Sequence, residues 1–205
     1  VRKCAEIVRN AGGLFVADEV QGGFGRMGTN FWAYQSHDVT PDFVTTGKPM
    51  GNGMPLSGVV TRRDIVQHFA RDKKYFNTFG GGPMACAAGL AVLDVLRDEG
   101  LQQNALDVGN YLICAMRKLA EEHECIGDIR GSGFFLGLDI VEDRQAKTPA
   151  PELASTMINR MRENGVLSGL IGPHMNVLKI RPPMCFTEEN ANLFLEILES
   201  ALPES

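Results

Sequence analysis

The chain has 205 residues, of which 44% are hydrophobic and 22% charged, and its formal net charge is −5. This length and composition are those of an ordinary globular protein with one large domain or two small ones. The negative net charge argues against a nucleic-acid partner. No apolar run reaches the ~18 residues of a membrane-spanning helix. Five scattered cysteines without a C-x-x-C pair argue against a disulfide framework or a zinc site and favour a cytoplasmic location.

Helices and short apolar strands alternate along the first half of the chain. Residues 1–10 have the pattern of the last turns of a helix, and the chain therefore enters in the middle of an element, as a fragment of a longer chain would. Apolar runs predict strands of a sheet that is covered on both faces over residues 14–17, 43–46 and 58–61. Helices are predicted over residues 64–70, 83–97 and 101–122.

The character of the chain changes after residue 124. The patterns predict a hairpin over 126–141, a helix over 152–164, strands over 166–167 and 177–180, and a helix over 187–202. We therefore predict an α/β fold with a mostly parallel sheet to about residue 105, followed by a smaller α+β domain.

Gly23, Gly25 and Gly28 have the G-x-G-x-x-G spacing of a dinucleotide-binding loop. In such a loop the first glycine follows the strand directly, whereas here Asp18 and Glu19 stand between them and would repel a pyrophosphate. We reject the nicotinamide interpretation on this ground. The glycines are expected instead to let the backbone pass close to a neighbour or turn with positive φ.

Two chemically active side chains follow predicted strands. Asp18 ends the first strand and Lys48 comes just after the second, at the carboxyl ends where open α/β sheets bind ligands. Taken alone, Lys48 would be read as a solvated surface charge and Asp18 as a helix cap or an ion-pair partner. Together they indicate pyridoxal 5'-phosphate (PLP), which needs an amine for its aldehyde and an acid for its ring nitrogen.

At this point the sequence resembles the class III (subgroup II) PLP-dependent aminotransferases over essentially its whole length. The resemblance rests on the blocks at 18–28, 47–55, 77–83, 127–133 and 179–183. It implies the PLP-dependent transferase fold type I, with residues 1–105 as the second half of the PLP-binding large domain. Residues 106–205 would form the interdomain helix and the C-terminal small domain, and the intact enzyme would be a homodimer.

The resemblance also implies a role for five residues. Lys48 would form the Schiff base and move the proton, Asp18 would pair with the pyridinium N–H, and Gln21 would donate to the phenolic oxygen. Thr78 would reach the cofactor phosphate of the neighbouring subunit, and Arg181 would clamp a substrate carboxylate. No metal site is expected. We interpret Arg26 and Arg130 as structural and the four histidines, His37, His68, His123 and His174, as non-catalytic.

Three functional interpretations stay open. Residues 172–186 look like the branch that contains alanine–glyoxylate aminotransferases and amino-alcohol phosphate phospho-lyases. We favour an aminotransferase that moves an amino group from an amine or amino acid to a keto acid, because Arg181 suits a carboxylate. A phospho-lyase would more often place a lysine or several donors there. In the third interpretation the chain is an inactive fragment, because the family's upstream phosphate loop and stacking aromatic residue have no counterpart here.

Overall fold

The computed structural model describes residues 1–203, which form two compact units. The first unit holds Val1–Arg26 and Asn30–Gln102, and the second holds Met27–Thr29 and the chain from Gln103 onward. This division, after Gln102, lies three residues before the boundary after residue 105 that the sequence predicts. Over residues 1–203, no helix combines the length and the apolar character that crossing a bilayer requires.

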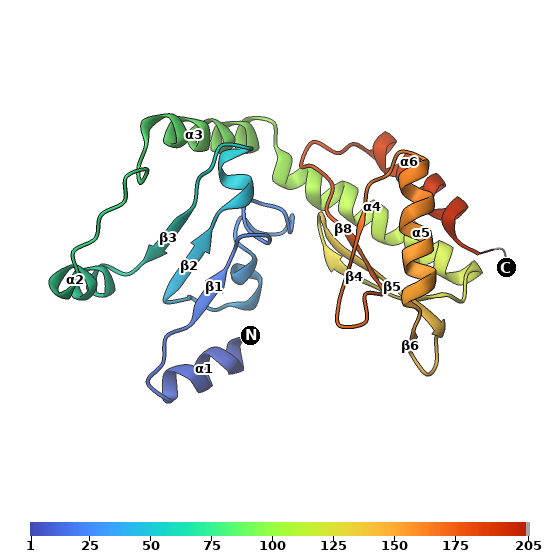
Figure 1. The fold of residues 1–205 in the computed structure, drawn as a ribbon, viewed down its shortest axis with the longest axis horizontal. Helices are drawn as coiled ribbons and strands as arrows, with labels where there is room; N and C mark the ends of the chain where they lie inside the picture. Colours follow the sequence, from blue (N-terminus) through green and yellow to red (C-terminus); the bar gives the residue numbers. More distant parts are fainter. Residues whose placement is uncertain (204–205) are drawn as a thin grey trace. The chain divides into compact units, whose positions relative to one another are not determined.

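The first unit is built on a three-stranded sheet in the order β1-β2-β3 (Figure 1). Its elements are α1 (Arg2–Asn10), β1 (Val16–Asp18), the 3₁₀ helix η1 (Ala33–His37), β2 (Phe43–Thr46), the 3₁₀ helix η2 (Lys48–Gly51), β3 (Gly58–Thr61), α2 (Arg63–Asp72) and α3 (Pro83–Asp98). Strands β1 and β2 run parallel, and β3 joins β2 antiparallel. The carboxyl ends of β1 and β2 therefore lie at the same edge of the sheet.

The covering of this sheet on both faces is not found at β3. Val59 and Val60 point to opposite faces and keep 63% and 59% of their surface exposed. Val16 on β1 is 50% exposed. β-Branched residues are enriched in strands, so an apolar β-branched run indicates a strand without showing which of its faces are covered. The apolar runs therefore predicted β2 and β3 at their observed bounds and β1 two residues early, whereas the covering of β3 on both faces was wrongly predicted.

One buried carboxylate holds the amino ends of these strands together. Asp42 directly precedes β2, and its side chain is only 4% exposed. It accepts a hydrogen bond from the Phe15 N–H at 2.8 Å, and it forms ion pairs with Arg9 at 3.3 Å and with Arg62. The Phe15 N–H first, and then the two guanidinium groups, lower the pKa of Asp42 below its usual value against the opposing effect of burial.

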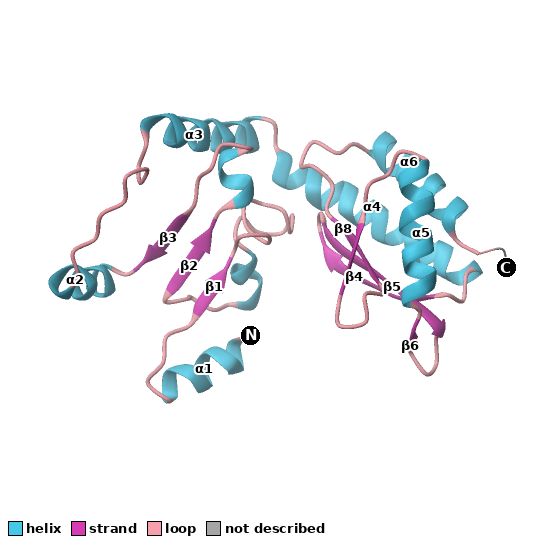
Figure 2. Ribbon diagram, in the orientation of Figure 1, coloured by secondary structure: helices cyan, strands magenta, loops and turns pink. Residues whose placement is uncertain are grey.

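The second unit is an antiparallel sheet in the order β4-β5-β8-β7, with the short β6 paired to β5 (Figure 2). Its elements are α4 (Leu101–Glu122), β4 (Ile126–Ser132), β5 (Phe135–Asp143), β6 (Thr148–Pro149), α5 (Pro151–Glu163), β7 (Gly169–Ile171), β8 (Val177–Ile180) and α6 (Glu188–Ala201). The predicted helix over 101–122 and the predicted strand over 177–180 are confirmed at both ends.

Alternate residues of β5 form the centre of the core of this unit. Leu136, Leu138 and Ile140 are fully buried. They belong to one apolar cluster with residues of all three helices, including Leu112, Met116, Met157, Met161, Ala191 and Leu198. Because side chains alternate across a strand, the opposite face of the sheet carries the intervening residues, among them Gly137 and Asp139.

The predicted strand over residues 166–167 is wrong. Gly165 has φ +92°, and its N–H donates to the carbonyl of Arg162, while the Val166 N–H donates to the carbonyl of Met161. These two bonds form the Schellman motif that closes α5, so Val166 still belongs to the end of the helix. Strand β7 begins only at Gly169.

Candidate active site

The two residues that carry the proposed chemistry follow neighbouring parallel strands. Asp18 is the last residue of β1 and lies opposite Thr45 of β2 in the register. Lys48 comes two residues after the end of β2. Both side chains are exposed at the carboxyl edge of the sheet. The structure therefore places Asp18 and Lys48 at adjacent strand ends, as the sequence predicts.

The Asp18 carboxylate is held by two donors. Its Oδ1 accepts the Val20 N–H at 3.0 Å and the Thr45 hydroxyl at 3.4 Å. Val16 lies two residues earlier on the same face of β1 and is 50% exposed, so this face of the strand is accessible to solvent. An oriented carboxylate on an open sheet face can accept a hydrogen bond from a protonated ring nitrogen.

Lys48 begins η2 in an unusual backbone conformation. Its φ is +41°, in the left-handed region that non-glycine residues seldom occupy. The turn is fixed by the Met50 N–H, which donates to the carbonyl of Gly47 at 3.1 Å, and η2 packs against Gly89 of α3. Backbone strain of this kind concentrates at functional sites, because the surrounding structure must enforce it. It supports a functional interpretation of Lys48 over that of a solvated surface charge.

Glu19, beside Asp18, has a structural role that the sequence did not reveal. It is only 2% exposed, and its two oxygens accept the backbone N–H groups of Ala33 and Tyr34, each at 2.8 Å. These donors open η1, which otherwise has unpaired N–H groups in its first turn. Packing against this loop also excludes a side chain at Gly23, because a Cβ there would lie 2.9 Å from the Trp32 ring.

The other two glycines of the G-x-G-x-x-G spacing also allow close packing. Within the first unit, a Cβ at Gly25 would lie 3.0 Å from the Cβ of Gln102. Within the second unit, a Cβ at Gly28 would lie 2.7 Å from the Cα of Leu106. Both glycines have positive φ, at +73° and +76°. The expectation of close backbone approach and positive φ is confirmed for both.

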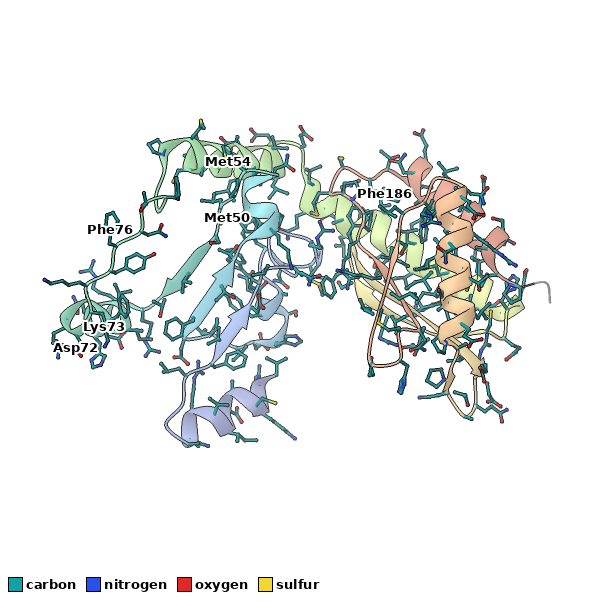
Figure 3. All side chains as sticks on the ribbon, viewed as in Figure 1. Met50, Met54, Asp72, Lys73, Phe76 and Phe186 are labelled. Carbon is teal, nitrogen blue, oxygen red and sulfur yellow. The ribbon has the colours of Figure 1, made fainter. Side chains whose placement is uncertain are left out.

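Gln21 and Thr78 are exposed residues of connecting segments. Gln21 lies in the turn that follows β1, and Thr78 lies in the segment between α2 and α3. The Thr78 segment also exposes aromatic rings: Phe76, labelled in Figure 3, is 87% exposed, and Phe79 is 90% exposed. The roles of Gln21 at the phenolic oxygen and of Thr78 at a phosphate stay predictions.

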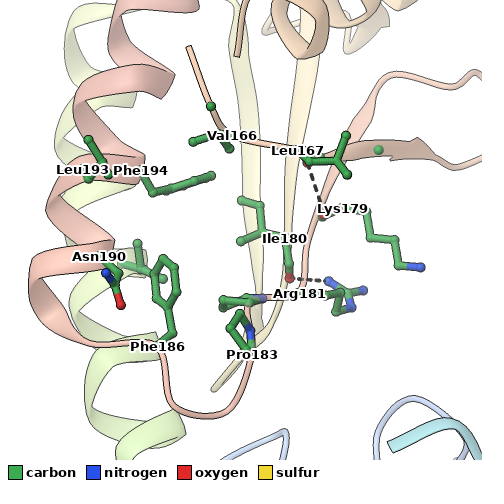
Figure 4. A pocket seen from close by; sticks show the side chains of 15 residues that line it. Val166, Leu167, Lys179, Ile180, Arg181, Pro183, Phe186, Asn190, Leu193 and Phe194 are labelled. Atoms are coloured by element: carbon green, nitrogen blue, oxygen red, sulfur yellow. Dashed lines mark hydrogen bonds between the residues drawn. The ribbon is translucent and has the colours of Figure 1, made fainter. Parts of the chain in front are cut away.

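Arg181 lies in the second unit, directly after β8, and contacts the protein extensively. Its Nη1 donates to the carbonyl of Leu136. It also donates, at 2.8 Å, to the carbonyl of Ile180, a bond that Figure 4 shows as a dashed line. The guanidinium carbon lies 3.5 Å from the centroid of the Phe135 ring, a cation–π distance. These contacts engage part of the donor fork that a bidentate carboxylate clamp needs. The clamp stays a prediction.

Lys179 is a cation that the sequence analysis missed. It pairs with Gly137 of β5 on one side and with Gly169 of β7 on the other, so its stem is flanked by backbone rather than by side chains. Lys179 and Arg181 both line a pocket of about 450 Å³ with Ser168, Pro183 and Phe186 among its other lining residues. The period-2 spacing in V-L-K-I-R was the signal, because it puts Lys179 and Arg181 on one side of the strand.

The described residues hold no group of three or more histidine, cysteine, aspartate or glutamate side chains that could bind a metal ion. The cysteines of this part of the chain are unpaired. The charged groups that the sequence and the geometry single out are the carboxylate of Asp18 and the amine of Lys48 in the first unit, and the two cations of the pocket in the second.

Comparison with known proteins places these residues in a family. The "Aminotransferase class-III" model matches residues 1–202. The chain is 49% identical over 192 residues to the alanine–glyoxylate aminotransferase 2-like protein of Drosophila melanogaster, covering 93% of this chain and 39% of that protein. It is 50% identical over 186 residues to ethanolamine-phosphate phospho-lyase homolog 1 of Caenorhabditis elegans, covering 89% of this chain and 40% of that protein.

A solved structure, that of a phospholyase from Arthrobacter in complex with phosphoethanolamine, superposes with a TM-score of 0.95 at 46% identity. The match covers 98% of this chain and 47% of that chain. The chain spans about 40% of the length of the curated relatives it matches. Its two units are part of the fold type I of PLP-dependent aminotransferases. The chain belongs to the class III aminotransferase family.

Proposed function

We propose that the protein is a PLP-dependent aminotransferase that moves an amino group from an amine or amino acid to a keto acid, with Lys48 as its catalytic amine. The observation that carries this proposal is the placement of Asp18 and Lys48 at the adjacent carboxyl ends of two parallel strands. The match of the class III family model over residues 1–202 supports it.

The residues present fit the cofactor of this family. An exposed carboxylate with two donors on one oxygen suits a ring N–H, and an exposed amine on a strained turn suits an aldehyde. When bound, PLP supplies an electron sink for the bond that breaks at the substrate's amine-bearing carbon. Lys48 Nζ would accept the proton from that carbon and deliver it to C4′ of the cofactor. Asp18 would keep the ring nitrogen protonated, and Gln21 would donate to the phenolic oxygen.

The 205-residue chain by itself should bind PLP weakly and should not turn over substrate. The chain spans about 40% of the length of its curated relatives, and the Asp18 and Lys48 side chains are exposed. An exposed site gives little of the desolvation that strengthens charged contacts. Titrating the chain and the full-length protein with PLP tests this, and equal affinity and turnover in the two would show that it is wrong.

Replacement of Lys48 tests the central proposal. Borohydride treatment followed by peptide mass spectrometry should find a reduced pyridoxyl group on Lys48 of the full-length protein. Lys48→Ala and Lys48→Arg should lose that label and about a thousandfold in turnover, within the range for removal of a proton-transferring group. Lys118→Ala, which removes an exposed lysine of α4, is the matched control. A label on another lysine, or activity kept in Lys48→Ala, would contradict the assignment.

A second candidate is a phospho-lyase that acts on a phosphorylated amino alcohol. Lys179 favours it: an ammonium on a flexible stem binds phosphate as a point charge, whereas Arg181 is held by backbone carbonyls and Phe135. The phosphoethanolamine complex of the Arthrobacter relative supports this candidate as well. Release of phosphate and ammonia from phosphoethanolamine without a keto acid would select it, and amino transfer that requires pyruvate or glyoxylate would select the aminotransferase.

We also propose a homodimer in which Thr78 reaches the cofactor phosphate of the neighbouring subunit. Support comes from the exposure of Tyr75, Phe76 and Phe79 around Thr78, at 73%, 87% and 90%. Exposed aromatic side chains grouped in this way are typical of an interface. Light scattering of the full-length protein should give a dimer, which Phe79→Asp should weaken; a monomeric active enzyme would contradict the proposal.

A further inference from the structure

The second hydrogen bond to Asp18 comes from the neighbouring strand. The parallel register of β1 and β2 sets Asp18 beside Thr45, so both side chains lie on one face of the sheet. The next residue, Thr46, points to the other face, where it is 5% exposed. Two adjacent threonines on β2 therefore stand in different environments, and only one of them reaches the proposed site.

The contacts of Asp18 are one-sided. Among residues 1–203, both hydrogen bonds that reach its carboxylate end on Oδ1, one from the Val20 N–H at 3.0 Å and one from the Thr45 hydroxyl at 3.4 Å. The Val20 bond comes from the turn that directly follows Asp18, whereas the Thr45 bond comes from the adjacent strand. Thr45 is thus the donor that ties the carboxylate to the frame of the sheet and leaves Oδ2 available.

We propose that Thr45 is the positioning residue for Asp18: its hydroxyl holds Oδ1, so that Oδ2 is presented to the ring nitrogen of the cofactor. This inference rests on the proposed function, because it assigns a task to Thr45 only if Asp18 binds that nitrogen. A carboxylate has two nearly equivalent oxygens and turns about its side-chain torsions. Fixing one oxygen by a second strand reduces the freedom that binding would otherwise have to remove.

The test compares the same substitution at two adjacent positions. Thr45→Val removes the hydroxyl that binds Asp18 and keeps the β-branched shape. Thr46→Val is the matched control, because the Thr46 hydroxyl is buried without a hydrogen-bond partner in the described part of the chain. The readout is the PLP dissociation constant of the full-length apo-protein, measured by equilibrium titration, with thermal unfolding of each apo variant as a check on folding.

Thr45→Val should weaken PLP binding about fivefold, the effect of one ordinary hydrogen bond, since 3.4 Å is long for a bond to a charged group. Thr45→Ser keeps the hydroxyl and should stay within about twofold of the wild type, as should Thr46→Val. In an Asp18→Asn background, Thr45→Val should have less than about twofold effect, because the two residues act as one unit.

The outcomes separate this inference from the proposed function. If Thr45→Val binds PLP as tightly as the wild type while Asp18→Asn binds poorly, Thr45 does not position Asp18 and the proposed function stands. If Thr45→Val is equally harmful with Asp18 present or replaced, it acts on the fold and the inference is wrong. If Asp18→Asn itself leaves PLP affinity unchanged, the assignment of Asp18, and with it the proposed function, fails.

Discussion

Replacing Asp42 with alanine should destabilise the first unit while leaving the second unit folded. The Asp42 side chain is 4% exposed and accepts the Phe15 N–H at 2.8 Å, so its removal leaves that donor without its partner in a partly buried position. An orphaned buried N–H costs about 1–3 kcal/mol. Arg9 and Arg62 are 41% and 54% exposed and can be solvated once Asp42 is gone. We therefore expect a total loss of about 2–3 kcal/mol, most of it from Phe15.

The pH dependence gives a second, independent signature of Asp42. Its pKa is lower in the folded than in the unfolded chain, so its ionised form contributes stability that is fully present above the unfolded value of about 3.9. That contribution is lost as the pH falls through the lower folded pKa. The difference in stability between the wild type and Asp42→Asn should therefore shrink as the pH falls from about 5 to about 2.

Urea unfolding followed by fluorescence measures both effects, because Trp32 is the single tryptophan and lies in the first unit. Asp38→Asn is the control: Asp38 pairs with Arg2 at 2.8 Å, but the two side chains are 84% and 57% exposed, so the loss should stay below about 0.5 kcal/mol. Equal losses in Asp42→Ala and Asp38→Asn, or a difference between wild type and Asp42→Asn that does not change with pH, would refute the reasoning.

Two further predictions concern the second unit, and circular dichroism during urea unfolding measures both. Gly109→Ala should destabilise by about 3 kcal/mol or more, because its Cβ would lie 2.3 Å from the Gly133 carbonyl oxygen, whereas Gly169→Ala, with no atom within 4 Å, should change stability by less than about 0.5 kcal/mol. Thr187→Ala should cost about 1 kcal/mol, because Thr187 and Asn190 form a reciprocal capping box at the start of α6, and Thr187→Ser should restore it. A tolerated Gly109→Ala, or a Thr187→Ser as unstable as Thr187→Ala, would contradict these accounts.

Elements whose signals lie within a few residues were predictable from the sequence. Helix α4 follows from its apolar period and the preceding Gly100, and α6 begins at a capping box that uses Asn190 in place of glutamate. At the start of α6 the side chains of Thr187 and Asn190 satisfy the backbone N–H groups, and Gly100 has φ +62°, which breaks the helical path before α4. Local hydrogen bonding therefore fixed them, whatever the rest of the fold does.

Features that depend on partners distant in sequence were not predictable in the same way. The run at 166–167 is apolar enough for a strand, yet Val166 donates to Met161 and closes a helix. The pairing of β3 with β2 is antiparallel, which the apolar pattern of β3 does not encode. The burial of strand residues was unpredictable for the same reason, since the exposure of Val59 depends on which other segments cover the sheet.

The residues of the proposed site also fall into these two groups, those with a local signal in the sequence and those identified only by a distant partner. Asp18 and Lys48 were found because their residue types follow strands, and strand ends are where ligands bind in such sheets. Thr45 and Lys179 were missed, because their significance lies in what stands opposite them: Asp18 across a parallel pair, and two glycines across antiparallel pairs. Such residues are identified by the register of the strand pairing, and not by the residue types of the sequence alone.

The G-x-G-x-x-G spacing of Gly23, Gly25 and Gly28 indicates a function only when the residues around it are considered as well. The spacing records that three positions exclude a side chain, and here the excluding neighbours are the Trp32 ring, Gln102 and the backbone of Leu106. A nucleotide loop leaves its backbone N–H groups free for phosphate. In this loop the N–H groups of Gly23 and Gly25 donate to the carbonyls of Glu19 and Phe31, and the Glu19 carboxylate binds the N–H groups that open η1. The two acids that precede the first glycine, Asp18 and Glu19, were the deciding signal, because their charges would repel a pyrophosphate.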